Sequence, residues 1–242
     1  MKIIRIPKCV STNSQIKDYY KHLPSTLPLC LITNHQTHGK GQLGAKWVVE
    51  ADQNLTFSFL FPNLKIPISQ AFKINLLTTL KLNEVFMDLG ISHLKFKWPN
   101  DLILSDKKIG GILIENMLQS NLIKRSVIGI GINVNQTNFG DLSQAGSLKN
   151  ILGREFSKKD IFSLIVEKFD DFERMIQETE LDELLDSYHN NLFRFQKVSM
   201  FEFGNKVQPG IIRRVKPNGR IEIEFEDQCF LDFDVKEIKL LF

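Results

Sequence analysis

The stretch KWPNDLILSDKKIGGILIE, residues 97–115, sets lysines, an amide and a carboxylate beside two short apolar runs. Pro99 favours an extended or turn geometry here, so Asn100 and Asp101 are expected at a turn next to the following strand. Asn100 could bind a ribose or phosphate oxygen. Asp101 could hold Mg²⁺, which prefers one or two carboxylates together with substrate phosphates. A plain turn is the alternative interpretation of this Asn-Asp pair.

Lys108 lies at the start of the next expected strand, in which Gly110-Gly111 leaves room for a ligand against the backbone. Asn133 ends another apolar run, VIGIGIN, and places a polar side chain at the end of a sheet strand. Together these side chains indicate one wall of a ligand site. A solvated hairpin tip at Lys107-Lys108 and a turn-forming Asn133 are the alternatives.

The run HGKGQLGAKW carries a formal G-x-G-x-x-G at residues 39–44. A dinucleotide-binding fingerprint would need a helix directly afterwards and an acidic residue about 20 positions on. Residues 61–63 read FPN at that distance, so this interpretation is rejected. Glycines do let backbone N–H groups approach a phosphate, Lys40 and Lys46 would offset its charge, and Trp47 could stack on an adenine. A flexible surface loop is the alternative.

The elements that must position these residues follow from the hydrophobic pattern. Helical spacing and capping residues predict helices, and apolar runs or alternation predict strands, without strict alternation of the two along the chain. This mixture favours an α+β fold with a mixed or antiparallel sheet backed by helices on one side. The expected strands are 3–6, 27–33, 54–61, 94–98, the run after 100 and 126–134; the expected helices are 12–22, 69–89, 157–169 and 180–192; residues 35–53 are expected to form a long loop.

The last 50 or so residues have a different pattern, with short runs in which apolar and polar residues alternate, such as KVSMFEF, GIIRRV and RIEIEF. Residues 217–219, Pro-Asn-Gly, are a hairpin turn signal. In residues 221–226, Ile and Phe alternate with Glu, which predicts one dry and one wet face. We therefore expect a catalytic or binding domain at 1–194 and a small five-stranded barrel at 195–242.

Bulk properties exclude several classes. The net charge of +3 is too small to indicate nucleic-acid binding by itself. No apolar run approaches the roughly 20 residues of a membrane span, and the N-terminus does not match a signal peptide. The three cysteines, Cys9, Cys30 and Cys229, are odd in number and lack metal-ligand spacing, so reduced thiols in a cytoplasmic protein are expected.

Taken jointly, these motifs resemble those of biotin–protein ligases. STN at 11–13, the glycine loop with its KW, KWPNDL followed by KKIGGILIE, and GIGIN occur in the same order as in that family. The resemblance covers about residues 11–135, and the terminal barrel looks like the family's small SH3-like domain. It implies the α+β fold of class II aminoacyl-tRNA synthetases and biotin ligases. It also implies use of biotin, ATP and Mg²⁺ to make biotinyl-5'-AMP, with transfer of biotin to a lysine of a carboxylase's biotin carboxyl carrier domain.

The resemblance also implies roles for individual residues. Lys108, with Lys40, would be catalytic, Lys108 touching both the biotin carboxylate and the α-phosphate. Asp101 would position the phosphates of ATP through the Mg²⁺ ion bound to them. The biotin pocket would comprise Ser11, Thr12, Asn13, Gln36, Gly39, Lys40, Gly41, Gln42, Lys108 and Gly111; the nucleotide would be served by Trp47, Lys97, Asn100, Asp101 and Asn133.

The glycine loop departs from the family pattern. Lys40 and Gln42 replace two arginines of the usual G-R-G-R-x-G, and Leu43 and Ala45 stand where basic residues are common. Loss of an arginine fork removes a bidentate grip on phosphate, so retention of the adenylate is the property most affected.

Two other functions compete with this interpretation. A lipoate–protein ligase or related acyltransferase belongs to the same superfamily, but the unit from KWPND to Lys108 fits the biotin branch. A non-enzymatic nucleic-acid-binding protein would use Arg213, Arg214, Lys216 and Arg220 of the terminal barrel. The first motif begins at residue 11, so we expect no N-terminal helix-turn-helix, no DNA binding and no membrane association; a homodimer is left open.

Overall fold

The largest element of the computed structural model is a mixed sheet. The structure describes the backbone of residues 1–242 and all side chains except those of Leu43 and Asp227. β1 and β2 are parallel and the remaining neighbours are antiparallel. In order across the sheet the strands are β1 (Lys2–Cys9), β2 (Leu29–Gln36), β5 (Leu55–Phe61), β10 (Leu122–Ile132), β9 (Lys107–Gln119), β8 (Asp101–Leu104) and β7 (Lys95–Lys97), with β6 (Ile66–Pro67) paired to β10.

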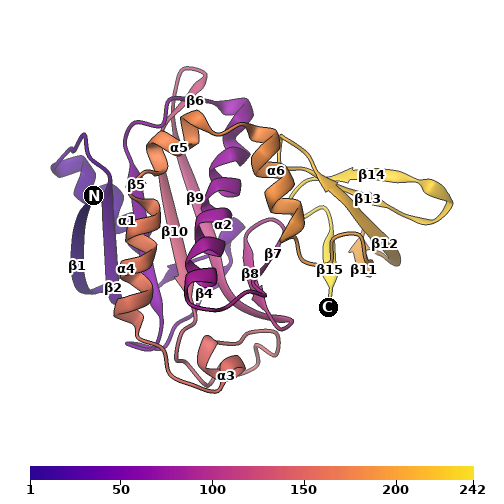
Figure 1. Cartoon of the computed structure of the whole chain (residues 1–242), viewed down its shortest axis with the longest axis horizontal. Coiled ribbons are helices and arrows are strands. Elements are labelled where there is room, and N and C mark those ends of the chain that lie inside the picture. The colour runs from indigo at the N-terminus through magenta and orange to yellow at the C-terminus, as the bar shows by residue number, and fades with distance from the viewer.

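Helices cover one face of this sheet (Figure 1). They are α2 (Ala71–Asp88), α4 (Lys158–Phe169), α5 (Phe172–Glu178) and α6 (Leu181–Asn190). Phe59 and Phe61 alternate along β5 toward this layer, where they stack on Phe169 and Phe172 with ring centroids 4.7 and 4.5 Å apart. The predicted sheet backed by helices is confirmed. Among the described helices none is both long and apolar enough to cross a membrane.

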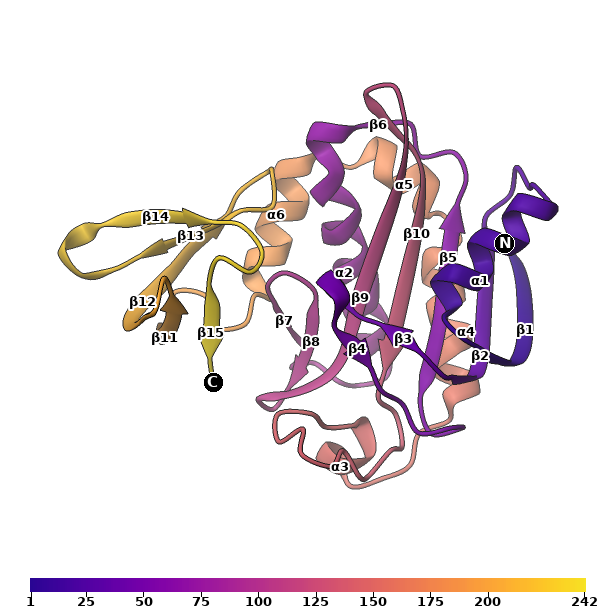
Figure 2. The same ribbon diagram turned by 180° about the vertical axis from the view of Figure 1, so that it is seen from behind.

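The opposite face carries α1 (Thr12–His22) and a small hairpin (Figure 2). α1 packs on β2, β5 and β10 through Ile16, which is fully buried. The hairpin consists of β3 (Gly39–Lys40), the 3-10 turn η1 (Gln42–Gly44) and β4 (Lys46–Trp47). The sequence predicted a long loop over 35–53, which is wrong at 35–36, where β2 continues, and at 39–47. The hairpin was missed because a two-residue pairing is too short to show an alternating pattern.

The predicted helices are confirmed, with two additions. Gly90 follows α2 with φ +76°, a conformation that suits glycine at a helix end. Ser157 caps α4 by accepting a hydrogen bond from the backbone N–H of Asp160. The helices α3 (Leu148–Leu152) and α5 were not predicted, because each has too few turns to show helical spacing.

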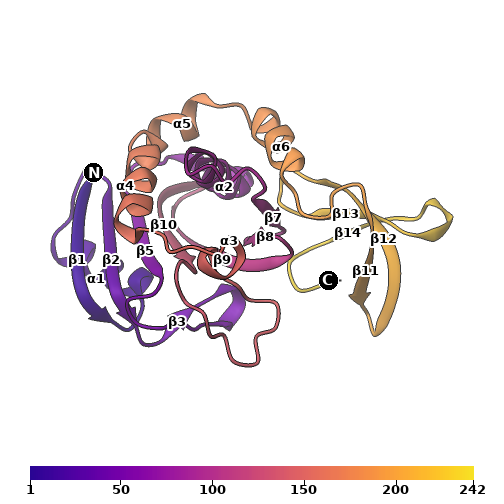
Figure 3. The ribbon, with the colours of Figure 1, turned by 60° about the horizontal axis from the view of Figure 1, so that its bottom comes forward.

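The C-terminal residues form a second, antiparallel sheet beside α6 and the β7–β8 edge (Figure 3). Its strands lie in the order β14 (Phe230–Phe233), β13 (Ile221–Glu224), β12 (Lys206–Val215), β11 (Val198–Phe203) and β15 (Lys239–Leu241). Five strands were expected and five are present. Over the described residues β14 and β15 are not paired with each other, so the sheet is open and the predicted closed barrel is not confirmed.

Charged side chains on this sheet pair with one another. Glu222 was predicted on a wet face, but only 9% of it is exposed, because Arg214 and Lys216 bond to its carboxylate at 2.9 and 3.1 Å. Arg213 pairs with Glu224 on the neighbouring strand. Ion pairs therefore occupy the basic residues on which the nucleic-acid interpretation depended.

Two hydrogen bonds join the C-terminal sheet to the rest of the protein through buried or half-buried groups. The indole Nε1 of Trp98 donates to the carbonyl of Gly219 at 2.8 Å. The backbone N–H of Val215 donates to Nε2 of His189 at 2.8 Å. Trp98, although part of the KWPND motif, thus turns toward the C-terminal sheet and fixes the position of that sheet against the β7–β8 turn.

Candidate active site

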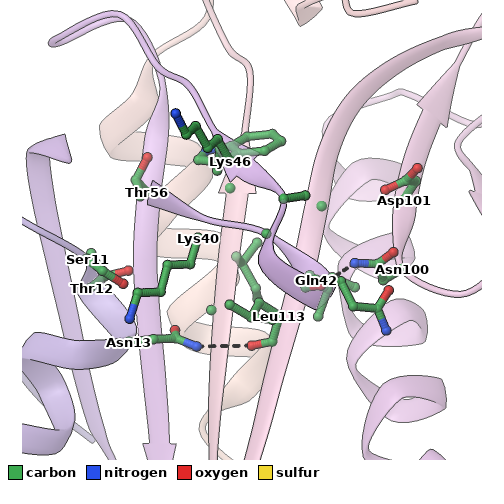
Figure 4. Close-up of a pocket in the computed structure, with 18 of the residues that line it drawn as sticks. Ser11, Thr12, Asn13, Lys40, Gln42, Lys46, Thr56, Asn100, Asp101 and Leu113 are labelled. Atoms are coloured by element: carbon green, nitrogen blue, oxygen red, sulfur yellow. Dashed lines mark hydrogen bonds between the residues drawn. The ribbon is translucent and has the colours of Figure 1, made fainter. Parts of the chain in front are cut away.

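A cavity of about 270 Å³ lies under the β3–β4 hairpin (Figure 4). Asn13 and Lys40 stand at one end of it, and Asn100 and Asp101 stand at the other. Most of the residues singled out in the sequence share this cavity, although they come from α1, β2, the hairpin, β8, β9 and β10. The lining includes Ser11, Thr12, Asn13, Gln36, Lys40, Gly41, Gln42, Trp47, Asn100, Asp101, Lys108 and Gly111.

The floor of the cavity is flat because two glycines alternate on one face of β10. A Cβ added at Gly129 would lie 2.3 Å from Oδ1 of Asn13, and one at Gly131 would lie 2.4 Å from Cε2 of Trp47. Both distances are too short for real atoms, so the two side chains can rest on β10 only where it carries no Cβ. The GIGIN motif therefore determines where Asn13 and Trp47 lie.

Asn13 belongs to a hydrogen-bond network at the same end. Its Oδ1 accepts from Oγ of Ser58 at 2.6 Å, and its Nδ2 donates to Oε2 of Glu115 at 2.7 Å. Oε1 of Gln36 accepts from the backbone N–H of Thr12 at 2.7 Å. Because hydrogen bonds fix the side-chain amides of Asn13 and Gln36, this end of the cavity offers polar groups in defined positions. Sequence reasoning missed Ser58 and Glu115, although each is a polar residue within an apolar strand.

Lys17 completes the network by pairing with Glu115 at 2.9 Å. Burial alone would raise the pKa of Glu115, but hydrogen bonds from Lys17 and Asn13 outweigh it, and the pKa lies below the ordinary value. The ionised form is therefore favoured in the folded protein. Stability from these contacts is present above the ordinary pKa of 4.5 and is lost as pH falls from there through the folded pKa.

Glu115→Gln is expected to lower the free energy of unfolding by roughly 1 kcal/mol at pH 7, because the pair is half exposed and partly screened. The difference from wild type should shrink as the pH falls below 4.5, where wild type loses the same charge. Urea unfolding at several pH values measures both quantities. The exposed Glu167→Gln is the control and should match wild type throughout; a pH-independent difference for Glu115→Gln would contradict the assignment.

At the other end, Lys108 and Lys97 flank one carboxylate. Nζ of Lys108 lies 2.5 Å from Oδ1 of Asp101, and Nζ of Lys97 lies 3.8 Å from Oδ2. Burial lowers the pKa of Lys97 below its ordinary value, and Asp101 opposes that shift. Lys107 points elsewhere and donates to the carbonyl of Ser143 at 2.7 Å. Of the two adjacent lysines at the hairpin, only Lys108 faces the cavity.

A second cavity of about 360 Å³ shares Trp47, Lys46 and Lys108 with the first. Nδ2 of Asn133 donates to the carbonyl of Gly146 at 3.0 Å. Two other polar atoms here, Oδ1 of Asn133 and Nε1 of Trp47, are buried without a hydrogen-bond partner among the described residues. Orphaned buried polar atoms are rare and indicate a missing partner. The arrangement suits an extended ligand that occupies both cavities and contacts Lys108 where the two cavities meet.

The first cavity is strongly cationic. Four lysines line it, and Asp101 is the one carboxylate among its described lining residues. The four lysines are Lys40, Lys46, Lys108 and Lys236. Such a surface favours an anionic ligand. The described residues hold no group of three or more His, Cys, Asp or Glu that could bind a metal ion, so a metal would have to share Asp101 with ligand oxygens.

Two residues assigned from the sequence lie outside both linings. Gly39 is buried beneath the hairpin, where an added Cβ would lie 2.3 Å from the carbonyl oxygen of Trp47. Lys97 lines a neighbouring apolar pocket between the two sheets. Asn100 lines the cavity, but its Nδ2 donates to the carbonyl of Ile112 at 2.7 Å. That amide nitrogen therefore stabilises β9.

The model of the biotin/lipoate A/B protein ligase family matches residues 7–133, a range that contains both ends of the cavity. The chain belongs to this family. It is 35% identical over 129 residues to the bifunctional ligase/repressor BirA of Escherichia coli, a match covering 53% of this chain and 39% of that relative. The chain therefore spans about two fifths of the length of this relative. Chloroplastic biotin–protein ligase 1 of Arabidopsis thaliana is 25% identical over 224 residues, covering 88% of this chain and 58% of that one.

Solved structures of other family members share the fold. A biotin protein ligase from Aquifex aeolicus, in complex with biotin and ATP, superposes with a TM-score of 0.78 at 23% identity. The match covers 99% of this chain and 98% of that chain. A Leishmania major biotin protein ligase in complex with biotinyl-5-AMP gives a TM-score of 0.67 at 18% identity. The α+β architecture of this family member is thus that of biotin protein ligases.

Proposed function

We propose that this family member is a biotin–protein ligase. It would activate biotin with ATP to biotinyl-5'-AMP and then transfer biotin to a lysine of a biotin carboxyl carrier domain. One observation carries the proposal: two cavities meet at Lys108, which lies 2.5 Å from Asp101 and beside Trp47. The similarity to the plant biotin–protein ligase supports the choice of biotin.

The first cavity suits biotin. Its network around Asn13 and Gln36 offers fixed polar groups for a small cyclic urea, while Ile112, Leu113 and Ile130 offer apolar contacts for an aliphatic chain. Ser11, Thr12, Lys40, Gly41, Gln42 and Gly111 complete the proposed biotin set, and Gly39, which lies outside the cavity, would act only by letting β3 approach β4 closely.

The second cavity suits the nucleotide. Oδ1 of Asn133 would accept a hydrogen bond from the adenine amino group, and Trp47 would stack on the ring. Lys97, Asn100 and Asp101 would stand on the phosphate side, as proposed from the sequence. Mg²⁺ would enter with ATP, held by phosphate oxygens and Asp101, and would supply neutralisation of phosphate charge.

In the first step a carboxylate oxygen of biotin attacks the α-phosphorus of ATP. The bond from that phosphorus to the oxygen bridging the β-phosphate breaks, and pyrophosphate leaves with the electron pair. Both reactants are anions, so the site must hold them in line and neutralise oxygen charge. Lys108 does this as a compact point charge that can touch oxygens of both groups. We propose Lys108 as the catalytic cation. Lys40, expected from the sequence to act with it, stands at the opposite end of the cavity beside Asn13, where it would contact biotin instead.

In the second step the acceptor lysine attacks the acyl carbon of biotinyl-5'-AMP, and AMP leaves. That amine has a reference pKa near 10.4 and must lose a proton first. Asp101 is the one carboxylate among the described lining residues and is the proposed proton acceptor. The β3–β4 hairpin over the cavity would keep water from the adenylate.

Gln42 and Lys40 in the hairpin stand where the family commonly has arginines. Neither can grip a phosphate in the bidentate manner of a guanidinium. We propose that this ligase releases its adenylate more readily than members that keep both arginines.

The remaining expectations accompany this proposal. We propose a boundary near residue 195, with residues 195–242 acting as the SH3-like domain of the family. Cys9, Cys30 and Cys229 are free thiols, which fits a cytoplasmic enzyme.

Biotin-dependent exchange of labelled pyrophosphate into ATP tests the first step without an acceptor. The purified chain should exchange label when biotin is present and not when lipoate replaces it. Exchange with lipoate instead would assign the chain to the lipoate branch of the family. Salt-sensitive binding to single-stranded nucleic acid, together with no exchange, would favour the non-enzymatic alternative.

A further inference from the structure

A separate cavity of about 580 Å³ lies beside the segment that connects α6 to β11, residues 191–197. Its other walls are β7, the β8–β9 turn and the last turn of α6. None of its described lining residues lines either cavity of the candidate active site. Its volume is in the range of small-molecule sites, roughly 300–1,000 Å³, so a ligand distinct from those of the active site would fit.

The connecting segment is hydrogen-bonded to both of the elements between which it runs. The backbone N–H of Phe96 on β7 donates to the carbonyl of Asn191, and the N–H of Phe193 donates to the carbonyl of Phe96, each at 2.9 Å. The N–H of Gln196 donates to the carbonyl of Ile212 on β12 at 3.2 Å. The shape of the cavity is therefore determined by the fold and needs no ligand to form it.

His189 on α6 lines the cavity and can offer it one N–H donor. Its Nε2 accepts a hydrogen bond from the backbone N–H of Val215 at 2.8 Å, so the proton of the neutral ring is on Nδ1. Phe195 stacks on the imidazole with ring centroids 5.1 Å apart and fixes its orientation. Burial lowers the pKa of His189 below its ordinary value, and Asp186 opposes that shift, so the ring is neutral at pH 7. No described residue accepts a hydrogen bond from Nδ1, which leaves this donor for a ligand.

Positive charge predominates in the lining. The described lining residues include three cations, Lys95, Arg194 and Lys197, and one carboxylate, Asp106. Arg194 approaches Asp106 only to 3.6 Å, and both side chains are partly exposed, so this ion pair is weak. Lys95 donates to the carbonyl of Asn190 at 3.0 Å, and neither it nor Lys197 forms an ion pair with a described residue. An anion in the cavity would therefore meet cations whose charge is largely uncompensated.

We propose that this cavity binds a small-molecule oxyanion, such as a phosphate group, through Nδ1–H of His189 and the cations of Lys95, Arg194 and Lys197. Such an anion accepts hydrogen bonds from α6, β7 and the connecting segment at once. Binding therefore holds the C-terminal sheet against the β7 edge, where the two sheets meet (Figure 3). This inference does not depend on the proposed function.

Inorganic phosphate is the probe, titrated into the full chain labelled with ¹⁵N. Binding should shift the Nδ1 resonance of His189, whereas potassium chloride at the same ionic strength should leave it unchanged. Lys108→Ala should show the same shift as wild type, because Lys108 lines only the cavities of the candidate active site and any phosphate bound there is a separate event.

Arg194→Gly is expected to raise the Kd for phosphate at this site about tenfold, the usual effect of losing one charged hydrogen bond. Arg194 has φ +62°, a conformation that glycine adopts at lower cost, so the variant preserves the path of the chain. Arg194→Lys keeps the charge and should retain most of the affinity. Lys206→Met, exposed at the start of β12 and outside the cavity, is the matched loss of one charge and should behave as wild type.

His189→Gln separates the role of Nδ1 from that of the bond to Val215, because Oε1 of Gln can still accept from that N–H. The variant should keep the wild-type unfolding temperature without phosphate and raise the Kd about fivefold, the effect of one neutral hydrogen bond. The backbone amide resonance of Phe195 reports binding in this variant.

Three results would overturn the inference. They are a His189 signal that phosphate does not move, a shift that chloride reproduces at equal ionic strength, and a Kd that is the same in Arg194→Gly as in Lys206→Met. A local shift that requires Arg194 and the Nδ1 donor, and that Lys108→Ala leaves intact, would confirm it.

Discussion

Lys108→Ala is expected to lower the rate of biotin adenylation by about 10²–10³-fold, the loss that follows removal of one preorganised oxyanion donor. Lys108 lines both cavities and lies 2.5 Å from Asp101, so the variant removes the cation that we propose contacts both anionic reactants. The pair is partly exposed, and its loss should change the free energy of unfolding by less than about 1 kcal/mol. Single-turnover formation of biotinyl-5'-AMP measures the effect on chemistry.

Lys107→Ala is the matched control, because the neighbouring lysine bonds to Ser143 outside the cavity and should leave adenylation unchanged. If Lys108→Ala forms the adenylate at the wild-type rate, Lys108 has no part in the mechanism. If both variants fail equally and unfold at lower urea concentrations, the loss reflects folding of the β8–β9 hairpin.

Gly129→Ala is expected to lower kcat/KM for biotin by about 10²-fold, the effect of a displacement near 1 Å within a site. Its new Cβ would lie 2.3 Å from Oδ1 of Asn13, so that amide must leave its place on β10. Asn13 should then lose its contacts with Ser58 and Glu115, and the polar end of the first cavity, where we propose that biotin binds, should be disordered. The KM for ATP should change much less, because the second cavity contains neither Gly129 nor Asn13.

Ile128→Val is the control for this variant, since Ile128 is a buried core residue on the same strand. It should cost about 1 kcal/mol of stability without altering the KM for biotin. Gly129→Ala with wild-type biotin kinetics would show that Asn13 does not contact the substrate; parallel losses for biotin and ATP would indicate a general distortion of β10.

Many residues of the site could be predicted from short segments of the sequence. Asp101 and Lys108 are joined by a tight hairpin, so their neighbourhood in space follows from their spacing, and Gly110-Gly111 between two apolar runs indicated open backbone. The long helix α2 and the strand β5 were predicted because each is long enough to show its period.

Residues brought together by tertiary packing could not be predicted in the same way. Glu115 and Lys17 lie almost 100 positions apart and meet because α1 packs on β10, the neighbour of the strand β9 that carries Glu115. Trp98 belongs to the most specific motif yet binds Gly219 of the other sheet. Lys236 reaches the cavity only because the two sheets dock at the β7–β8 edge. No spacing within a single segment encodes these contacts.

Mass detection of biotinyl-5'-AMP tests the central claim most directly. The purified chain, incubated with biotin and ATP, should form and release the adenylate, and addition of a biotin carrier domain should replace that signal with a singly biotinylated carrier protein. If no adenylate forms and the carrier remains unmodified while the chain is folded, the two cavities around Lys108 do not form a biotin-activating site.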